Sequence, residues 1–160
     1  MATYDYEVLN KWDKRFLSLA EHISAWSKDP STKCGAVITK GNRIVSLGFN
    51  GFPMGVIDHT ASYHNRDLKY EMILHAEVNA ITFSKEPLSN CTIYTWPFQP
   101  CCRCASQIIQ NGIKKVIAPQ CTDKILELRW KESMEISQQM YKDADVFLIE
   151  VAVLNNSTQE

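Results

Sequence analysis

The sequence predicts a layered α/β fold in one domain. Segments whose apolar residues recur every three or four positions alternate with short β-branched and aromatic runs, so helices and strands follow one another along the chain. The chain has 160 residues, 45% hydrophobic and 22% charged, which is enough for one core without disulfides or other staples. We therefore expect a single domain over residues 1–154 and a polar tail at 155–160.

The N-terminal part predicts one helix and then a β-hairpin. Apolar residues recur at helical spacing over residues 7–26, and the step Asp29-Pro30 ends this helix because proline disfavours helical geometry in the residue before it. Residues 34–38 and 44–49 are apolar runs around Lys40-Gly41-Asn42, which is typical of a hairpin with a glycine-containing turn.

The rest of the chain adds a long loop and continues the alternation. Residues 50–70 show no sustained period, and because a loop of this length is usually functional, we expect it to wall the active site. Helical spacing predicts helices at 75–83, 105–109 and 123–141, and β-branched or apolar runs predict strands at 91–96, 115–118 and 145–153.

Composition and charge argue against several classes of protein. Lys plus Arg number 17 and Asp plus Glu 18, a formal charge of −1, so we expect a small-molecule substrate and no nucleic-acid partner. The N-terminal residues lack the pattern of a signal peptide, and no stretch reaches the roughly 20 apolar residues that cross a bilayer. We expect a soluble, cytoplasmic protein without membrane contact, with its six cysteines reduced.

Two short motifs predict a zinc site. Cys101 and Cys104 lie three residues apart on the first turn of a predicted helix, so their sulfurs point the same way. The positive end of that helix lowers the pKa of the thiols, and Pro100 suits the helix start because no backbone donor is needed there. His75 can supply a third ligand and leave the fourth tetrahedral position open for water, as in catalytic zinc sites.

Glu77 predicts what such a site does. It lies two residues after His75 and faces another direction on the helix, so it can move protons without binding the metal. Zinc lowers the pKa of a bound water to about 7, which provides a nucleophile at neutral pH. His-Ala-Glu followed by Pro-Cys-Cys-Arg-Cys matches the signature of zinc deaminases, in which a histidine and two cysteines bind zinc and the glutamate does not.

A structural zinc site would need a fourth ligand, and no spare cysteine or histidine is paired at ligand spacing. Cys34 and Cys91 lie in apolar strands and are expected to be core thiols. Cys102 is turned away by helical geometry, although an exchange with its neighbour as ligand stays open. His59 and His64 could form an accessory metal or effector site, but loop histidines are mostly solvated.

Three further motifs carry a resemblance to one enzyme family. They are Asp29-Pro30-Ser31-Thr32-Lys33-Cys34-Gly35-Ala36-Val37, Gly48-Phe49-Asn50-Gly51-Phe52-Pro53 and His75-Ala76-Glu77-Val78-Asn79-Ala80-Ile81. Over about residues 12–118 the chain resembles deoxycytidylate deaminases. The resemblance implies hydrolysis of dCMP to dUMP for thymidylate synthesis, on a three-layer α/β/α cytidine-deaminase-like fold with a central mixed five-stranded sheet. It also implies a homo-oligomer, commonly a hexamer.

The resemblance further implies contacts to a substrate or effector nucleotide. The positions are Ser31, Thr32, Lys33, Asn50, Gly51 and Ala76. Asn50 should bind the sugar or a bound nucleotide, because its amide can donate to and accept from a hydroxyl; an asparagine that only forms a turn is the alternative. The hydroxyls of Ser31 and Thr32 and the cation of Lys33 suit a monophosphate; the alternative is that Lys33 is simply a surface charge.

Some features depart from the family pattern. Many relatives are activated by dCTP and inhibited by dTTP, and some carry an arginine where this chain has Glu86, which leaves that regulation open. The segment Trp96-Pro97-Phe98-Gln99 is longer than in many members, so the rim of the pocket is expected to differ. Phe83 resembles an aromatic residue near the nucleotide in some members, but core packing is favoured.

Other functions remain as alternatives. The same metal chemistry suits another small substrate, such as dCTP or a nucleoside, and only pocket contacts discriminate between them. An editing deaminase acting on tRNA or DNA would need a basic channel, which the balanced charge disfavours. A non-catalytic zinc module would keep the ligands but not need Glu77.

Overall fold

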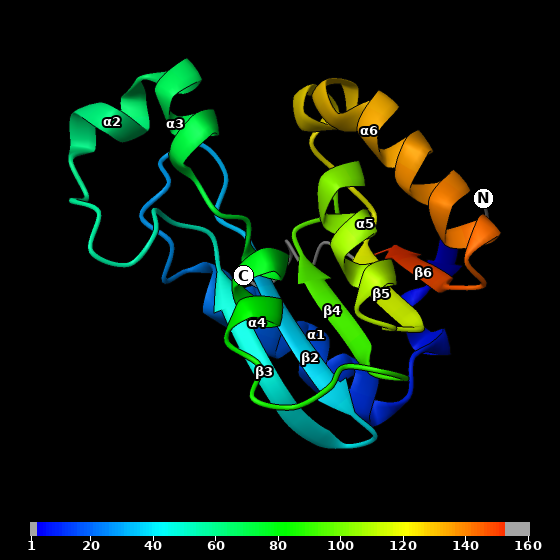
Figure 1. Ribbon diagram of the computed structural model, residues 1–160. Coiled ribbons are helices and arrows are strands. Elements are labelled where there is room, and N and C mark those ends of the chain that lie inside the picture. The colour runs from blue at the N-terminus through cyan, green and yellow to red at the C-terminus, as the bar shows by residue number, and fades with distance from the viewer. Residues whose placement is uncertain (1–2, 153–160) are drawn as a thin grey trace, which may run out of the picture.

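A mixed six-stranded β-sheet forms the centre of the protein, in the order β1-β6-β5-β4-β2-β3 (Figure 1). The computed structural model describes residues 3–152, so the predicted boundary at residue 154 and the tail at 155–160 lie outside the described residues. The strands are β1 Thr3–Asp5, β2 Gly35–Lys40, β3 Arg43–Phe49, β4 Thr92–Trp96, β5 Lys115–Pro119 and β6 Phe147–Ala152. Strands β1, β6, β5 and β4 pair in parallel, and β2 is antiparallel to both β4 and β3.

The sheet contains all the predicted strands and one more, so the expected count of five is wrong. The additional strand, β1, pairs with β6 at the edge of the sheet, where Thr3 lies opposite Glu150. All three residues of β1 are exposed, so no alternation of buried and exposed positions marks it in the sequence. Pairing with β6, rather than any local pattern, makes this segment a strand.

Helices cover both faces of the sheet, which confirms the predicted α/β/α layers. Because neighbouring residues of a strand point to opposite faces, Val37 of β2 packs on the side of α1 (Lys11–Ser24). Ala36 and Ile38 join the core on the other side, with α4 (Ala76–Thr82). In Figure 1, α1 lies behind the sheet, and α4, α5 (Cys102–Gln110) and α6 (Lys124–Asp143) lie in front of it.

The helix predicted over residues 7–26 is shorter than expected. A single 3-10 turn, Tyr6–Val8, precedes Asn10, and only then does α1 begin. The Asn10 side chain accepts hydrogen bonds from the backbone N–H groups of Trp12 (2.8 Å) and Asp13 (2.9 Å). A residue that caps a helix in this way has an extended backbone, as Asn10 does. The helix therefore starts after Asn10, although the apolar spacing begins before it.

The segment 50–70 is not the irregular loop that the sequence predicts. Two short helices occupy much of it, α2 (Thr60–His64) and α3 (Arg66–Met72), separated by an extended Asn65. Helices of five and seven residues are too short to show a sustained apolar period. Their positions depend on tertiary contacts, including the stacked rings of Phe52 and Tyr63, whose centroids are 4.1 Å apart.

Two glycines let helices approach the sheet closely. A Cβ on Gly35 of β2 would overlap the backbone of Ala20 in α1. A Cβ on Gly48 of β3 would lie 2.6 Å from the carbonyl oxygen of Ala76 and 2.6 Å from the nitrogen of Ala80. Gly48 therefore sets how near α4 lies to the sheet, and the residue before α4 is His75.

The longest helix among residues 3–152 is α6, with 20 residues. Over that part of the chain, no helix combines the length and the apolar character needed to cross a membrane.

Candidate active site

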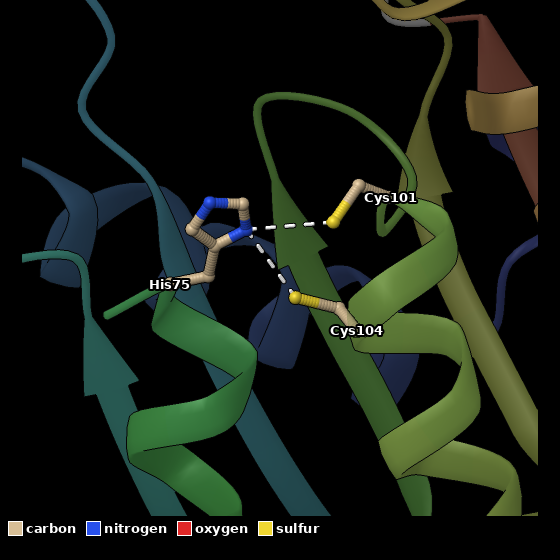
Figure 2. A group of neighbouring side chains, drawn as sticks. All are labelled: His75, Cys101 and Cys104. Carbon is tan, nitrogen blue, oxygen red and sulfur yellow. Dashed lines mark hydrogen bonds between the residues drawn. The ribbon is translucent and has the colours of Figure 1, made fainter. Parts of the chain in front are cut away.

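Three potential metal ligands converge between the N-terminal ends of α4 and α5. His75 is the N-cap of α4, Cys101 is the N-cap of α5, and Cys104 lies in the first turn of α5. The His75 Nδ1 atom lies 3.5 Å from the Cys101 sulfur and 3.3 Å from the Cys104 sulfur, as Figure 2 shows. All three ligand atoms lie within 4.8 Å of one another.

The group fits a catalytic zinc ion. With Zn–S near 2.3 Å and Zn–N near 2.0 Å, tetrahedral geometry separates a sulfur and a nitrogen ligand by about 3.5 Å, close to both distances between His75 and the sulfurs. Within residues 3–152 the group contains only these three ligands, so one tetrahedral position is left for water or substrate. Cys102 is not part of it, as helical geometry predicts; its backbone N–H donates to Ser133 Oγ at 2.9 Å.

Hydrogen bonds among these side chains shift their protonation. The hydrogen bond with Cys104 is the largest influence that lowers the pKa of Cys101 to about 4, so Cys101 is a thiolate at neutral pH. The hydrogen bond with Cys101 raises the pKa of His75 to about 8. The bond with Cys101, together with burial, raises the pKa of Cys104, so a bound cation would have to displace its proton.

Glu77 lies beside the ligands without joining them. It is in the first turn of α4, is only 7% exposed, and lines the same pocket as His75 and Cys101. Burial is the largest influence on this carboxyl group and raises its pKa, whereas the nearby His75 lowers it. Its carboxylate is outside the group of three, so it can exchange protons with a molecule in the pocket while the metal position stays free.

The pocket contains half of the predicted nucleotide contacts. Ser31, Thr32 and Asn50 line it together with His75 and Glu77. They come from the segment before β2 and the end of β3, which the antiparallel pairing of these strands brings together. Far-apart motifs of the sequence therefore meet at one cavity.

The other three predicted contacts are not among the lining residues. Lys33 is exposed and is not among the residues that line the pocket, which agrees with the surface alternative. Gly51 pairs with Leu74 through backbone hydrogen bonds of 3.1 and 2.8 Å. Ala76 is completely buried, side chain and backbone together, so none of its surface is open to the pocket.

Asn50 is a structural clamp as well as a pocket residue. Its Oδ1 accepts a hydrogen bond from the backbone N–H of Cys34 at 2.8 Å, and its Nδ2 donates to the carbonyl of Thr32 at 2.9 Å. Its own carbonyl accepts from Ser27 Oγ at 2.9 Å. One amide hydrogen and one lone pair of the side chain remain for a ligand, so both sequence interpretations describe part of its role.

A buried ion pair adjoins Ser31, and its lysine, Lys69, also lines the pocket. Lys69 of α3 donates to Asp29 at 3.1 Å and to Ser31 Oγ at 3.2 Å, and both charged side chains are only 6% exposed. Asp29 also accepts the backbone N–H of Ser31 at 2.8 Å. No pattern in the sequence of α3 marks Lys69 as a buried lysine.

Further pocket residues come from segments that no motif indicated. Phe98 and Gln99 belong to the long segment before Pro100, which the sequence did single out as a departure. Arg129 and Trp130 belong to α6, and Trp130 packs edge-on against His75 with ring centroids 6.3 Å apart. No local signal could have identified these two residues, because α6 reads as an ordinary polar amphipathic helix.

Helix α6 is fixed to the loop that carries the cysteines. Ser137 is completely buried and donates from Oγ to the carbonyl of Pro100 at 3.0 Å. Ser133 accepts the N–H of Cys102. The position of Arg129 and Trp130 over the site therefore follows from the same contacts that hold the metal loop.

Four further side chains that the sequence singles out lie in different environments. Cys91 is a core thiol as predicted, but Cys34 is only partly buried and lines the pocket. Phe83 is 49% exposed, so core packing was wrong for it. Glu86 forms a bidentate pair with Arg43, with distances of 2.6 and 2.9 Å.

The alternative of an accessory metal site at His59 and His64 finds no support in the geometry. Among residues 3–152, the group of His75, Cys101 and Cys104 is the one that brings three metal-ligating side chains together, and neither His59 nor His64 takes part. His64 lines a separate surface hollow with Lys28 and Asp58, which pair with each other at 2.7 Å.

Comparison with known proteins identifies the family of this chain. The family described as the cytidine and deoxycytidylate deaminase zinc-binding region matches residues 10–120. A protein of Aliivibrio fischeri, described as an uncharacterized deaminase in the luxG 3' region, is 52% identical over 139 residues, which cover 87% of this chain and 92% of that protein. A probable deoxycytidylate deaminase of Caenorhabditis elegans is 38% identical, over 82% of this chain and 69% of its own length.

A solved structure agrees with these sequence matches. The crystal structure of the dCMP deaminase from the cyanophage S-TIM5, in complex with dCMP and dUMP, superposes with a TM-score of 0.69. That comparison has 25% sequence identity and covers 89% of this chain and 98% of the phage protein. The matched region contains the three converging ligands and Glu77. The chain therefore belongs to the family of zinc-binding cytidine and deoxycytidylate deaminases.

Proposed function

We propose that this protein is a zinc-dependent deoxycytidylate deaminase, which hydrolyses dCMP to dUMP and so supplies thymidylate synthesis. The observation that carries the proposal is the convergence of His75, Cys101 and Cys104 at a pocket that His75, Cys101 and the buried Glu77 line. Relatives named deoxycytidylate deaminase, and a structural neighbour in complex with dCMP and dUMP, support this substrate.

In the proposed mechanism His75, Cys101 and Cys104 would hold the zinc ion. Zinc, when bound, supplies Lewis-acid activation of water. Glu77 takes one proton from the attacking water and gives it to the ring nitrogen, and then takes the second proton from the newly attached hydroxyl and gives it to the departing amine. Water oxygen bonds to the carbon that carries the amino group, the C–N bond breaks, and ammonia leaves. Burial of Glu77 excludes bulk water that would otherwise compete for the proton.

The remaining pocket residues orient the nucleotide. Asn50 has one donor and one acceptor site left for a sugar hydroxyl, after its two bonds to the backbone. Ser31 and Thr32 present hydroxyls beside it, and Ser31 is held by Lys69. Trp130, edge-on to His75, forms an apolar wall against which a pyrimidine ring can pack.

Ammonia release and the accompanying ultraviolet change test the proposal directly. Zinc-loaded protein is offered dCMP, dCTP, deoxycytidine and CMP separately, each with and without dCTP or dTTP as effector. Preferential turnover of dCMP is expected. Preferential turnover of dCTP or a nucleoside would reassign the substrate, and no turnover of any cytosine compound would overturn the proposal.

Substitution of Glu77 tests the assigned proton transfer. The variant Glu77→Gln keeps a similar shape but cannot accept a proton, so kcat should fall by roughly 10²–10⁴-fold while one zinc per chain is retained. The control is Glu21→Gln, which makes the same change at an exposed position of α1. Normal kcat in Glu77→Gln would show that another group moves the proton.

Four further properties stay predictions of the same proposal. These are a single domain over residues 1–154, cytoplasmic location, assembly into a homohexamer, and regulation by dCTP and dTTP. Light scattering of the zinc-loaded protein with and without each effector measures the assembly state. A regulated enzyme should also show a sigmoidal dependence on dCMP that dCTP removes.

A further inference from the structure

The loop between β4 and α5 separates two cavities. One is the pocket that His75 and Glu77 line. The other lies between α6 and the strands β5 and β6, where Gln120 and Glu150 are among its lining residues, and we call it the α6 hollow. Within residues 3–152, Gln99 is the residue that the two cavities have in common. Gln99 therefore forms the wall between them.

The order of the strands explains why the two cavities are neighbours. Gln99 follows β4, Gln120 follows β5, and Glu150 lies in β6, and these strands pair in parallel in this order. The carboxyl ends of parallel strands meet at one edge of the sheet, which is where α/β proteins bind ligands. Helix α6 borders both cavities, because Trp130 lines the pocket and Glu127 lines the α6 hollow.

Buried hydrogen bonds fix the backbone on each side of Gln99. The Thr95 hydroxyl donates to the carbonyl of Phe98 at 2.9 Å, and the Ser137 hydroxyl donates to the carbonyl of Pro100 at 3.0 Å. Both donors come from buried residues, Thr95 in β4 and Ser137 in α6. The loop cannot move away from the pocket without breaking one of these bonds, so the position of the wall is set by the fold.

The Gln99 side chain is restrained as well. The residue is only 2% exposed, so neighbouring atoms cover nearly all of it. Burial raises the pKa of the Glu150 carboxyl group, and a hydrogen bond from the Gln99 side chain lowers it. Glu150 thus holds the amide from the side of the α6 hollow. A packed and hydrogen-bonded side chain leaves no free space between the two cavities.

The wall stands next to the position of the departing amine. The metal ligands converge between α4 and α5, and Figure 2 shows His75 facing Cys101 and the loop that precedes it. In the proposed mechanism Glu77, on α4, protonates the ring nitrogen. The amino group is on the neighbouring side of the same carbon and extends toward the loop, where Phe98 and Gln99 line the pocket. Gln99 is two residues before Cys101 in the chain.

We propose that Gln99 restricts the substrate to an unsubstituted amino group by closing the pocket toward the α6 hollow. This inference rests on the proposed function. An alkyl group on the amine needs space that the Gln99 side chain fills, and a close-packed wall excludes it sterically. A shorter side chain would let the alkyl group extend into the α6 hollow, where Leu128 and Met134 offer apolar surface. Gln99 is thus a specificity-determining residue for the leaving group.

Turnover of a substituted substrate tests this role. The value of kcat/KM is measured for dCMP and for N4-methyl-dCMP, which with water would give dUMP and methylamine, on zinc-loaded wild-type protein, Gln99→Ala and Gln99→Met. Zinc content is determined for each protein. In Gln99→Ala the ratio of kcat/KM for N4-methyl-dCMP to that for dCMP should rise by about tenfold to hundredfold. Gln99→Met should show a smaller rise, because methionine keeps an unbranched side chain of similar length.

A binding measurement gives a second readout that needs no turnover. The dissociation constants of dCMP and N4-methyl-dCMP are compared in Glu77→Gln, with and without Gln99→Ala, and the substituted nucleotide should gain affinity relative to dCMP only where Gln99 is replaced.

Gln107→Ala is the matched control, because it makes the same change at an exposed position of α5 that lines neither cavity. An unchanged ratio in Gln99→Ala, or an equal rise in Gln107→Ala or Gln99→Met, would overturn the inference. Binding of both nucleotides without turnover by the wild type would count against the proposed function alone, because the ratio of dissociation constants would still decide the role of Gln99.

Discussion

The substitution Asn50→Ala separates the two roles that the structure gives this side chain. Asn50 is 5% exposed and clamps the segment before β2 through Cys34 N–H and Thr32 C=O, at 2.8 and 2.9 Å. Alanine removes both hydrogen bonds and leaves two backbone groups without partners. The cost is about 1–3 kcal/mol for each unsatisfied group, and because Thr32 and Cys34 are only partly buried we expect about 2–4 kcal/mol in total.

Urea unfolding of the zinc-loaded variant measures this loss. The slope of the free energy against urea should stay constant, so that the midpoint alone reports the change. Thr32 and Cys34 line the pocket, and their displacement should lower kcat/KM for dCMP and deoxycytidine by similar factors. Asn42→Ala, at an exposed position of the turn between β2 and β3, is the control and should change stability by less than about 0.5 kcal/mol. If Asn50→Ala reduced the free energy of unfolding as little as Asn42→Ala does, while kcat/KM fell strongly, Asn50 would act on the ligand only. The structural role of its two hydrogen bonds would then be refuted.

The remaining predictions concern the close helix packing and the metal. In Gly48→Ala the new Cβ would lie 2.6 Å from the backbone of α4. The free energy of unfolding in urea should therefore fall by about 1–3 kcal/mol, and a zinc titration should show weaker zinc binding. Gly41→Asn is the control, because Gly41 has φ of +58°, which asparagine tolerates, and a Cβ there would have no neighbour within 4 Å. An equal loss in the free energy of unfolding in Gly41→Asn would contradict the role assigned to close packing at Gly48. Cys104→Ala should lose bound zinc by elemental analysis, whereas Cys102→Ala, whose sulfur lies outside the ligand group, should keep one zinc per chain. Full zinc content in Cys104→Ala would reassign that ligand.

Segments with a sustained apolar pattern could be predicted from sequence, and segments without one could not. Helix α6 follows from an apolar period, and strands β2 and β4 follow from apolar or β-branched runs that extend over most of the element. The edge strand β1 has three exposed residues, and α2 has five residues, so neither leaves a period to detect. Asn10 shows a further limit, because its side-chain cap starts α1 inside a segment whose apolar spacing continues through it.

The sequence by itself determined the metal site, because its chemistry is encoded locally. Cys101 is the N-cap and Cys104 lies in the first turn of one helix, and His75 and Glu77 hold the corresponding places in another, so the start of each helix orients its pair. Only the tertiary structure decided what surrounds the metal. Whether a lysine is neutralised by Asp29, as Lys69 is, or an arginine has no carboxylate within 4.0 Å among residues 3–152, as with Arg129, depends on which distant side chains lie nearby. Burial and electrostatic compensation are properties of neighbours in space, and no spacing along the chain records them.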